Sequence, residues 1–125
     1  YNKPDMVIFA ISITRFEAKK AQQLLMKEKI KVSIVNILWI KPLKVSKKSL
    51  DNLKKSKYGG IVMDDDYKNG IAKSIANDLS LKTNKLVSTM GLQDKTAGTG
   101  KKLDNLPPTA KEIYNNVKNI IKNGF

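Results

Sequence analysis

Three consecutive aspartates, Asp64, Asp65 and Asp66, form the one acidic cluster of the sequence. Carboxylates at the carboxyl end of a strand could bind Mg²⁺ or act as general acid and base. Adjacent residues of a strand point to opposite faces, however, so three in a row cannot converge on one ion. A solvated, aspartate-rich loop is therefore the favoured interpretation.

A second candidate is the glycine-rich segment 98–101, where glycine amides and Lys101 could surround a phosphate. A phosphate-binding loop needs the pattern GxxxxGK followed by Ser or Thr at a strand-to-helix turn. Here Lys95 stands where the first glycine is required, and Lys102 follows Lys101. A free-standing nucleotide-binding domain built on this segment is therefore a minor hypothesis.

Cysteine and histidine are both absent from the sequence. Their absence excludes thiolate nucleophiles, Ser-His-Asp triads, Cys/His zinc sites and disulfide frameworks. Any metal would need oxygen ligands alone. We therefore expect no catalytic, cofactor-binding or metal-binding residues in this chain.

The chain of 125 residues is strongly basic, with 24 lysine and arginine residues against 11 acidic ones and a formal net charge of +13. Such a balance can indicate nucleic-acid binding. Arginine, whose planar fork reads phosphate and guanine, occurs only at Arg15, and the lysines are spread along the chain. A solvated basic surface is favoured. A free-standing lysine-rich module that binds nucleic acid or other anionic partners stays open as the alternative.

The longest apolar run, residues 6–11, is far shorter than the roughly 20 residues that span a bilayer, and no signal-peptide pattern opens the chain. These features predict a soluble, cytoplasmic protein.

Strand-like and helix-like segments alternate along the chain. Strands are expected at residues 6–13, 31–40, 60–63 and 85–90. Helices are expected from Thr14 to about residue 29, after a cap at Ser46, from residue 71, and after Thr109. Thr14 with Glu17 and Thr109 with Glu112 both show the capping-box spacing. This alternation predicts a mainly parallel sheet covered by helices on both faces.

Several short segments, in a fixed order over nearly the whole chain, carry a family resemblance. They are residues 5–8, the strand 32–40 followed by Lys41-Pro42-Leu43, residues 61–65, Asn69-Gly70-Ile71, and residues 91–94 with the later Gly98. Together they resemble the carboxyl-terminal domain of transketolase-like, thiamine-diphosphate-dependent enzymes. The chain departs from the family pattern at Ile11, where glycine is frequent, and at Lys44, where aspartate is frequent.

The resemblance implies a three-layer α/β/α domain with a mixed, mainly parallel five-stranded sheet, one strand being antiparallel. It implies a single domain over residues 1–125, cut from a longer chain, with residues 1–4 as a linker. In such enzymes two amino-terminal domains hold thiamine diphosphate and magnesium and perform ketol transfer on sugar phosphates. This domain would be non-catalytic, supporting the dimer and the substrate entrance. Its partners would be the amino-terminal domains or subunit of the same enzyme, with a homodimer in the parent. The single arginine argues against nucleic acid as a partner, and the short apolar runs predict no membrane partner.

Two short segments are candidates for shaping an interface in such an assembly. The first is a rigid proline bend at Lys41, Pro42 and Leu43, and the second is a glycine turn at Asn69 and Gly70. Each would fix the direction of the elements that flank it. The alternative, that both segments serve only the folding of this domain, is equally open.

Overall fold

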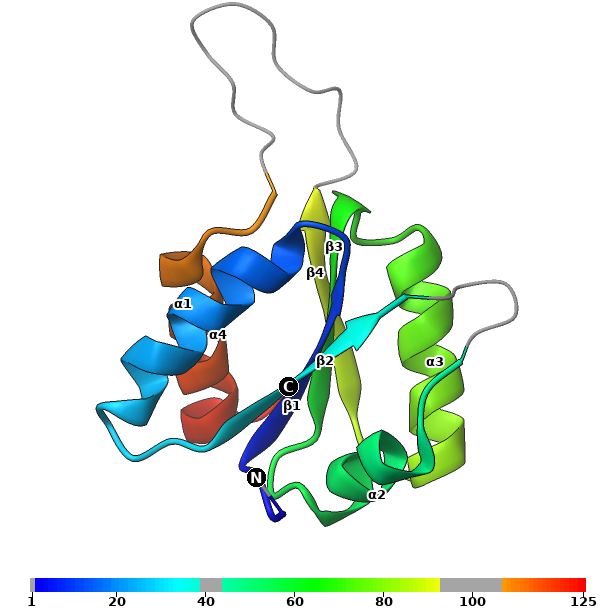
Figure 1. Cartoon of the computed structure of the whole chain (residues 1–125), viewed down its shortest axis with the longest axis horizontal. Coiled ribbons are helices and arrows are strands. Elements are labelled where there is room, and N and C mark those ends of the chain that lie inside the picture. Colours follow the sequence, from blue (N-terminus) through cyan, green and yellow to red (C-terminus); the bar gives the residue numbers. More distant parts are fainter. Residues whose placement is uncertain (1, 39–43, 93–106) are drawn as a thin grey trace, which may run out of the picture.

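The computed structural model describes residues 2–38, 44–92 and 107–125. Strands and helices alternate in the order β1 (Met6–Ile11), α1 (Thr14–Met26), β2 (Val32–Ile37), α2 (Lys47–Lys55), β3 (Gly60–Tyr67), α3 (Ile71–Thr83), β4 (Val87–Leu92) and α4 (Ala110–Asn123). The strands form one sheet in the order β2-β1-β3-β4, and every neighbouring pair is parallel (Figure 1).

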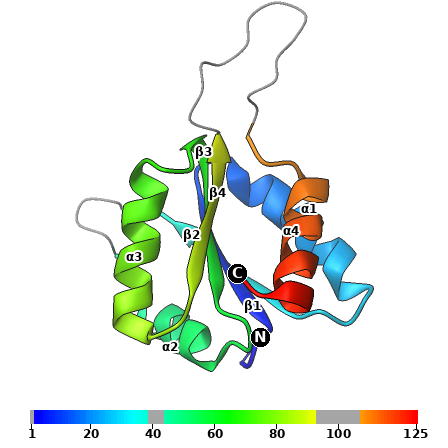
Figure 2. The ribbon, with the colours of Figure 1, turned by 180° about the vertical axis from the view of Figure 1, so that it is seen from behind.

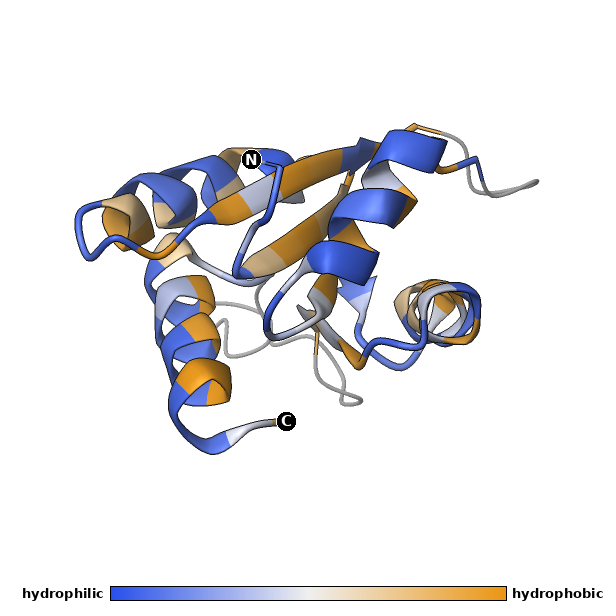
Figure 3. Cartoon of the chain, turned by 90° about the horizontal axis from the view of Figure 1, so that it is seen from below, coloured by the Kyte–Doolittle hydropathy of each residue, from blue (hydrophilic) through white to orange (hydrophobic). Residues whose placement is uncertain are grey.

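The sheet lies between two helical layers, α1 with α4 on one face and α2 with α3 on the other (Figures 1 and 2). Apolar strands fill the centre, and the helices turn polar residues outward (Figure 3). The predicted three-layer α/β class is confirmed. The described residues contain four parallel strands, so the count of five is off by one there, and the antiparallel strand is not among them.

β1 is the most deeply buried strand, since all six of its residues are buried. Met6 and Ile8 join the core cluster beneath α1 and α4, whereas Val7 and Phe9 join the cluster beneath α2 and α3. A strand covered on both faces needs apolar residues at every position. The unbroken apolar run at residues 6–11 satisfies this need.

Two of the three predicted helix caps are confirmed. Ser46 Oγ accepts a hydrogen bond from the Ser49 amide at 3.1 Å, and Thr109 Oγ1 accepts one from the Glu112 amide at 3.2 Å. The predicted cap at Thr14 is wrong, because α1 already includes Thr14 and its buried hydroxyl donates to the Ile11 carbonyl at 2.6 Å. None of the described helices is long and apolar enough to cross a membrane.

The first strand and helix end earlier than their hydrophobic patterns predicted. β1 stops at Ile11 because Ser12 has a φ of 59°, which turns the chain out of the extended conformation. α1 stops at Met26, and Lys29 has a φ of 61°. A residue with a left-handed backbone conformation cannot continue the regular hydrogen-bond pattern of a strand or a right-handed helix.

Candidate functional site

Large apolar side chains are uncovered where β1 and β2 end. Ile13 is 59% exposed, Phe16 55% and Leu38 76%. We call these three residues the carboxyl-edge surface. Scattered exposed apolar residues are ordinary, but a group of them gathered at one edge is typical of a surface that packs against another protein.

Two neighbouring hollows, of about 360 and 270 Å³, make this edge concave. Arg15 and Asn36 line both of them, so together they form one groove between α1 and β2. The Arg15 guanidinium lies 4.8 Å from the centroid of the Phe16 ring. Arginine and aromatic residues are enriched at protein interfaces, where an apolar floor has a polar rim.

The predicted proline segment adjoins this surface in sequence. Lys41, Pro42 and Leu43 lie outside the described residues. The exposed Leu38 is the last described residue before them. The interface role of these three residues stays a prediction.

Asn69 and Gly70 lie in the turn between β3 and α3. The Gly70 amide donates to the Tyr67 carbonyl at 3.0 Å, and the Gly70 carbonyl accepts from the Lys73 amide at 3.2 Å. These bonds set the start of α3. Asn69 lines a hollow beside β4, whereas Leu38, the last described residue before the proline segment, follows β2 at the opposite edge of the sheet.

The aspartates do not form the solvated loop that the sequence predicted. They belong to β3, and Asp64 is only 3% exposed. Burial raises the pKa of the Asp64 carboxyl, and a hydrogen bond with Asp65 raises it further. Asp64 Oδ1 accepts the Asp66 amide at 3.2 Å. Among the described residues no group of three or more His, Cys, Asp or Glu side chains could hold a metal ion.

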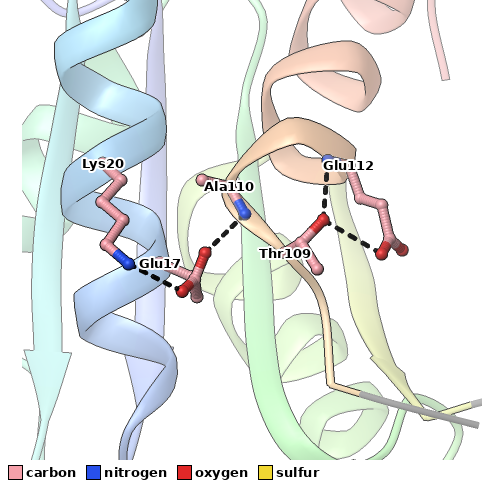
Figure 4. A network of polar contacts seen from close by, with 5 residues as sticks. All are labelled: Glu17, Lys20, Thr109, Ala110 and Glu112. Atoms are coloured by element: carbon pink, nitrogen blue, oxygen red, sulfur yellow. Dashed lines mark hydrogen bonds and ion pairs between the residues drawn. The ribbon is translucent and has the colours of Figure 1, made fainter. Parts of the chain in front are cut away.

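A polar network ties the start of α1 to the start of α4 (Figure 4). Glu17 Oε2 accepts the Ala110 amide at 2.7 Å, and its Oε1 accepts Lys20 Nζ at 3.2 Å. These two donors, the amide first, lower the pKa of Glu17 because they favour the carboxylate. Thr109 Oγ1 donates to Glu112 Oε1 at 3.1 Å. The network fixes the helix that carries Phe16.

Sequence reasoning missed both the carboxyl-edge surface and this network. One signal was available for the surface: Phe16 lies off the stripe of Ala18, Ala21 and Leu25, which buries against the sheet. No local signal existed for the network, because Glu17 and Ala110 are 93 residues apart.

The fold and the surface define a parallel α/β domain whose uncovered apolar edge suits packing against other protein. Residues 2–113 match the sequence family described as "Transketolase, C-terminal domain", and the chain belongs to this family. It is similar to a solved structure described as "Split gene transketolase, inactive beta4 tetramer", with a TM-score of 0.77 and 20% identity. The likeness, which shows the fold, covers 98% of this chain and 39% of that one. No curated protein sequence matches the chain.

Proposed function

We propose that this chain is the non-catalytic carboxyl-terminal domain of a transketolase-like enzyme, in which it supports assembly with the amino-terminal domains, the dimer and the substrate entrance. The observation that carries the proposal is the uncovered carboxyl-edge surface on a member of this family. The similar solved structure, described as a tetramer, supports association with further domains or subunits. A cytoplasmic enzyme that transfers ketol groups between sugar phosphates is the parent that we propose.

Burial of the carboxyl-edge surface would make a substantial contribution to such an assembly. Fully burying an exposed Phe, Leu or Ile side chain is worth about 1.5–3 kcal/mol. Each of the three side chains is already partly covered, so about 1–2 kcal/mol each is the expected gain. A few such anchors commonly dominate a protein interface.

Thiamine diphosphate and magnesium, which the family implies for the whole enzyme, do not fit the described residues of this chain. Mg²⁺ needs several convergent oxygen ligands. Asp64 is buried inside β3, Asp66 is exposed, and the described residues offer no metal-binding cluster. We therefore assign the cofactor and the chemistry to the amino-terminal domains.

Sedimentation of this chain mixed with the two-domain amino-terminal part of the enzyme tests the proposal. We expect a complex, and we expect the double variant Phe16→Asp/Leu38→Asp to weaken it at least 100-fold, because two carboxylates would be desolvated. The matched control is Leu81→Asp/Leu86→Asp, which changes side chains that are 77% and 67% exposed outside this surface. Equal weakening by both pairs, or no complex with the unchanged chain, would contradict the proposal.

The lysine-rich alternative has one specific observation in its favour. α2 has the sequence KKSLDNLKK, in which four of nine residues are lysine. This alternative predicts binding to a short DNA duplex that falls steeply with salt. A flat, negligible binding signal at low salt would end it.

A further inference from the structure

β4 has a free edge in the described part of the chain, where it pairs only with β3. The Leu86 and Leu92 carbonyls accept the Gly60 and Lys68 amides, so the even-numbered positions direct their backbone groups toward β3. The backbone groups of the odd-numbered positions, Val87, Thr89 and Gly91, therefore point away from β3. Such a row of backbone donors and acceptors is a template for another strand.

A hollow lies on each side of this edge. The one beside α3 has a volume of about 420 Å³, and the one beside α4 about 400 Å³. Lys68 and Thr89 line both. Successive side chains of a strand point to opposite faces, so a strand added to β4 would place alternate side chains in the two hollows.

The two hollows differ in charge. Lys68 and Lys73 line the hollow beside α3, and no acidic side chain does so among the described residues. The start of α3, capped by Gly70 without a side-chain hydrogen bond, adds the positive end of a helix dipole. On the α4 side, Lys68 faces the carboxylate of Glu112 among asparagines, so that hollow offers less net positive charge, and Glu112 would repel a second carboxylate.

We propose that the β4 edge binds an extended segment of a partner protein by strand addition, with aspartate or glutamate at alternate positions facing Lys68 and Lys73 and uncharged residues between them. The lining residues of α3, from Lys73 to Ser80, span roughly 10 Å of helix, which matches about three extended residues. A second copy of this basic chain would bring two lysine pairs together, so an acidic partner is the better match. This role goes beyond the assembly role, because it uses the sheet edge opposite β2.

The test is a titration of the isotope-labelled chain with a blocked seven-residue peptide that has aspartate at positions two, four and six and valine or threonine elsewhere. We expect the amide signals of Val87, Thr89 and Gly91 to shift and their hydrogen exchange to slow. The double variant Lys68→Ala/Lys73→Ala should bind about tenfold more weakly or worse. The control Lys54→Ala/Lys55→Ala removes the same charge from α2 and should bind within twofold of the unchanged chain.

Four results would overturn the proposal. One is the absence of peptide binding by the folded chain without substitutions. Another is equal weakening by both lysine pairs, which would indicate general charge attraction. A third is equal binding of a peptide with its three aspartates in a row. The last is slowed exchange at these amides through self-association without peptide, which would make a second copy the occupant.

Discussion

The contact between Glu17 and the first turn of α4 gives a sharp prediction about stability. Glu17→Ala removes the acceptor of the Ala110 amide, which then loses its 2.7 Å hydrogen bond. A side-chain cap is typically worth about 1 kcal/mol. The Glu17 side chain is 35% exposed, so water screens part of the interaction, and we expect Glu17→Ala to lower the free energy of unfolding by about 0.5–1 kcal/mol. Glu17→Gln keeps an acceptor oxygen and should lose about half as much.

The same contact sets a pH dependence with a definite sign. Because the pKa of Glu17 is lowered in the folded chain, its stabilisation is fully present above the unfolded pKa of about 4.3. It is lost as the pH falls through the lower folded pKa. Urea unfolding followed by circular dichroism should therefore show a gap between the unchanged chain and Glu17→Gln at pH 7 that closes in acid.

Asp78→Asn is the matched control for this experiment. It removes one carboxylate and breaks an exposed pair with Lys82, 3.0 Å long, on α3. Exposed pairs of this kind contribute less than about 0.5 kcal/mol. If Glu17→Ala costs no more than Asp78→Asn, or if the gap for Glu17→Gln widens in acid, the reasoning about the α1–α4 contact is refuted.

Three further changes test the backbone and the buried carboxyl by urea unfolding. Ser12→Gly should stabilise the chain by about 0.5–1 kcal/mol, since glycine accepts the φ of 59° without strain; a loss of stability would contradict this. Gly59→Ala should cost more than about 3 kcal/mol of folding stability, because the new Cβ would collide with the Leu86 carbonyl. Gly124→Ala is the control, since Gly124 also has a positive φ but has open space around it, and it should cost about 1 kcal/mol. Similar costs for the two changes would show that φ alone matters. Asp64→Asn should raise the free energy of unfolding at pH 7, because the ionised carboxylate of Asp64 is buried. Since the pKa of Asp64 is raised in the folded chain, this gain should disappear below the unfolded pKa of about 3.9. A gain that persists at pH 3 would contradict the explanation.

The sequence predicted which segments are strands and which are helices, because these depend on patterns of neighbouring residues. The apolar run of β1, the caps at Ser46 and Thr109 and the apolar stripe of α4 are all properties of a few adjacent residues. The family resemblance then supplied the layered architecture, which the structure confirms for the described residues.

Errors arose where a distant contact decides the outcome. Thr14 and Glu17 have the spacing of a capping box, but neither side chain caps α1. The Thr14 hydroxyl donates to the Ile11 carbonyl, and the Glu17 carboxylate accepts from the Ala110 amide. Asp64 looked like a loop residue, yet β3 continues through it to Tyr67, with an irregular register after Met63. Packing around the sheet, which a local pattern cannot represent, overrode these propensities.

The candidate site was only partly within reach of the sequence. Asn69 and Gly70 were found as a turn, and the structure places them there. Helical spacing placed Phe16 off the buried stripe of α1, but the exposure of Leu38 depends on which helices cover the end of β2, and no spacing rule encodes that.

Reconstitution of ketol transfer tests the central claim most directly. The amino-terminal part of the enzyme, supplied with thiamine diphosphate and Mg²⁺, is titrated with this chain, and transfer between two sugar phosphates is followed. The assembly role predicts that activity rises and saturates at equimolar chain, and that Phe16→Asp/Leu38→Asp fails to restore it while Leu81→Asp/Leu86→Asp succeeds. Full activity without this chain, or equal rescue by both variants, would contradict the claim.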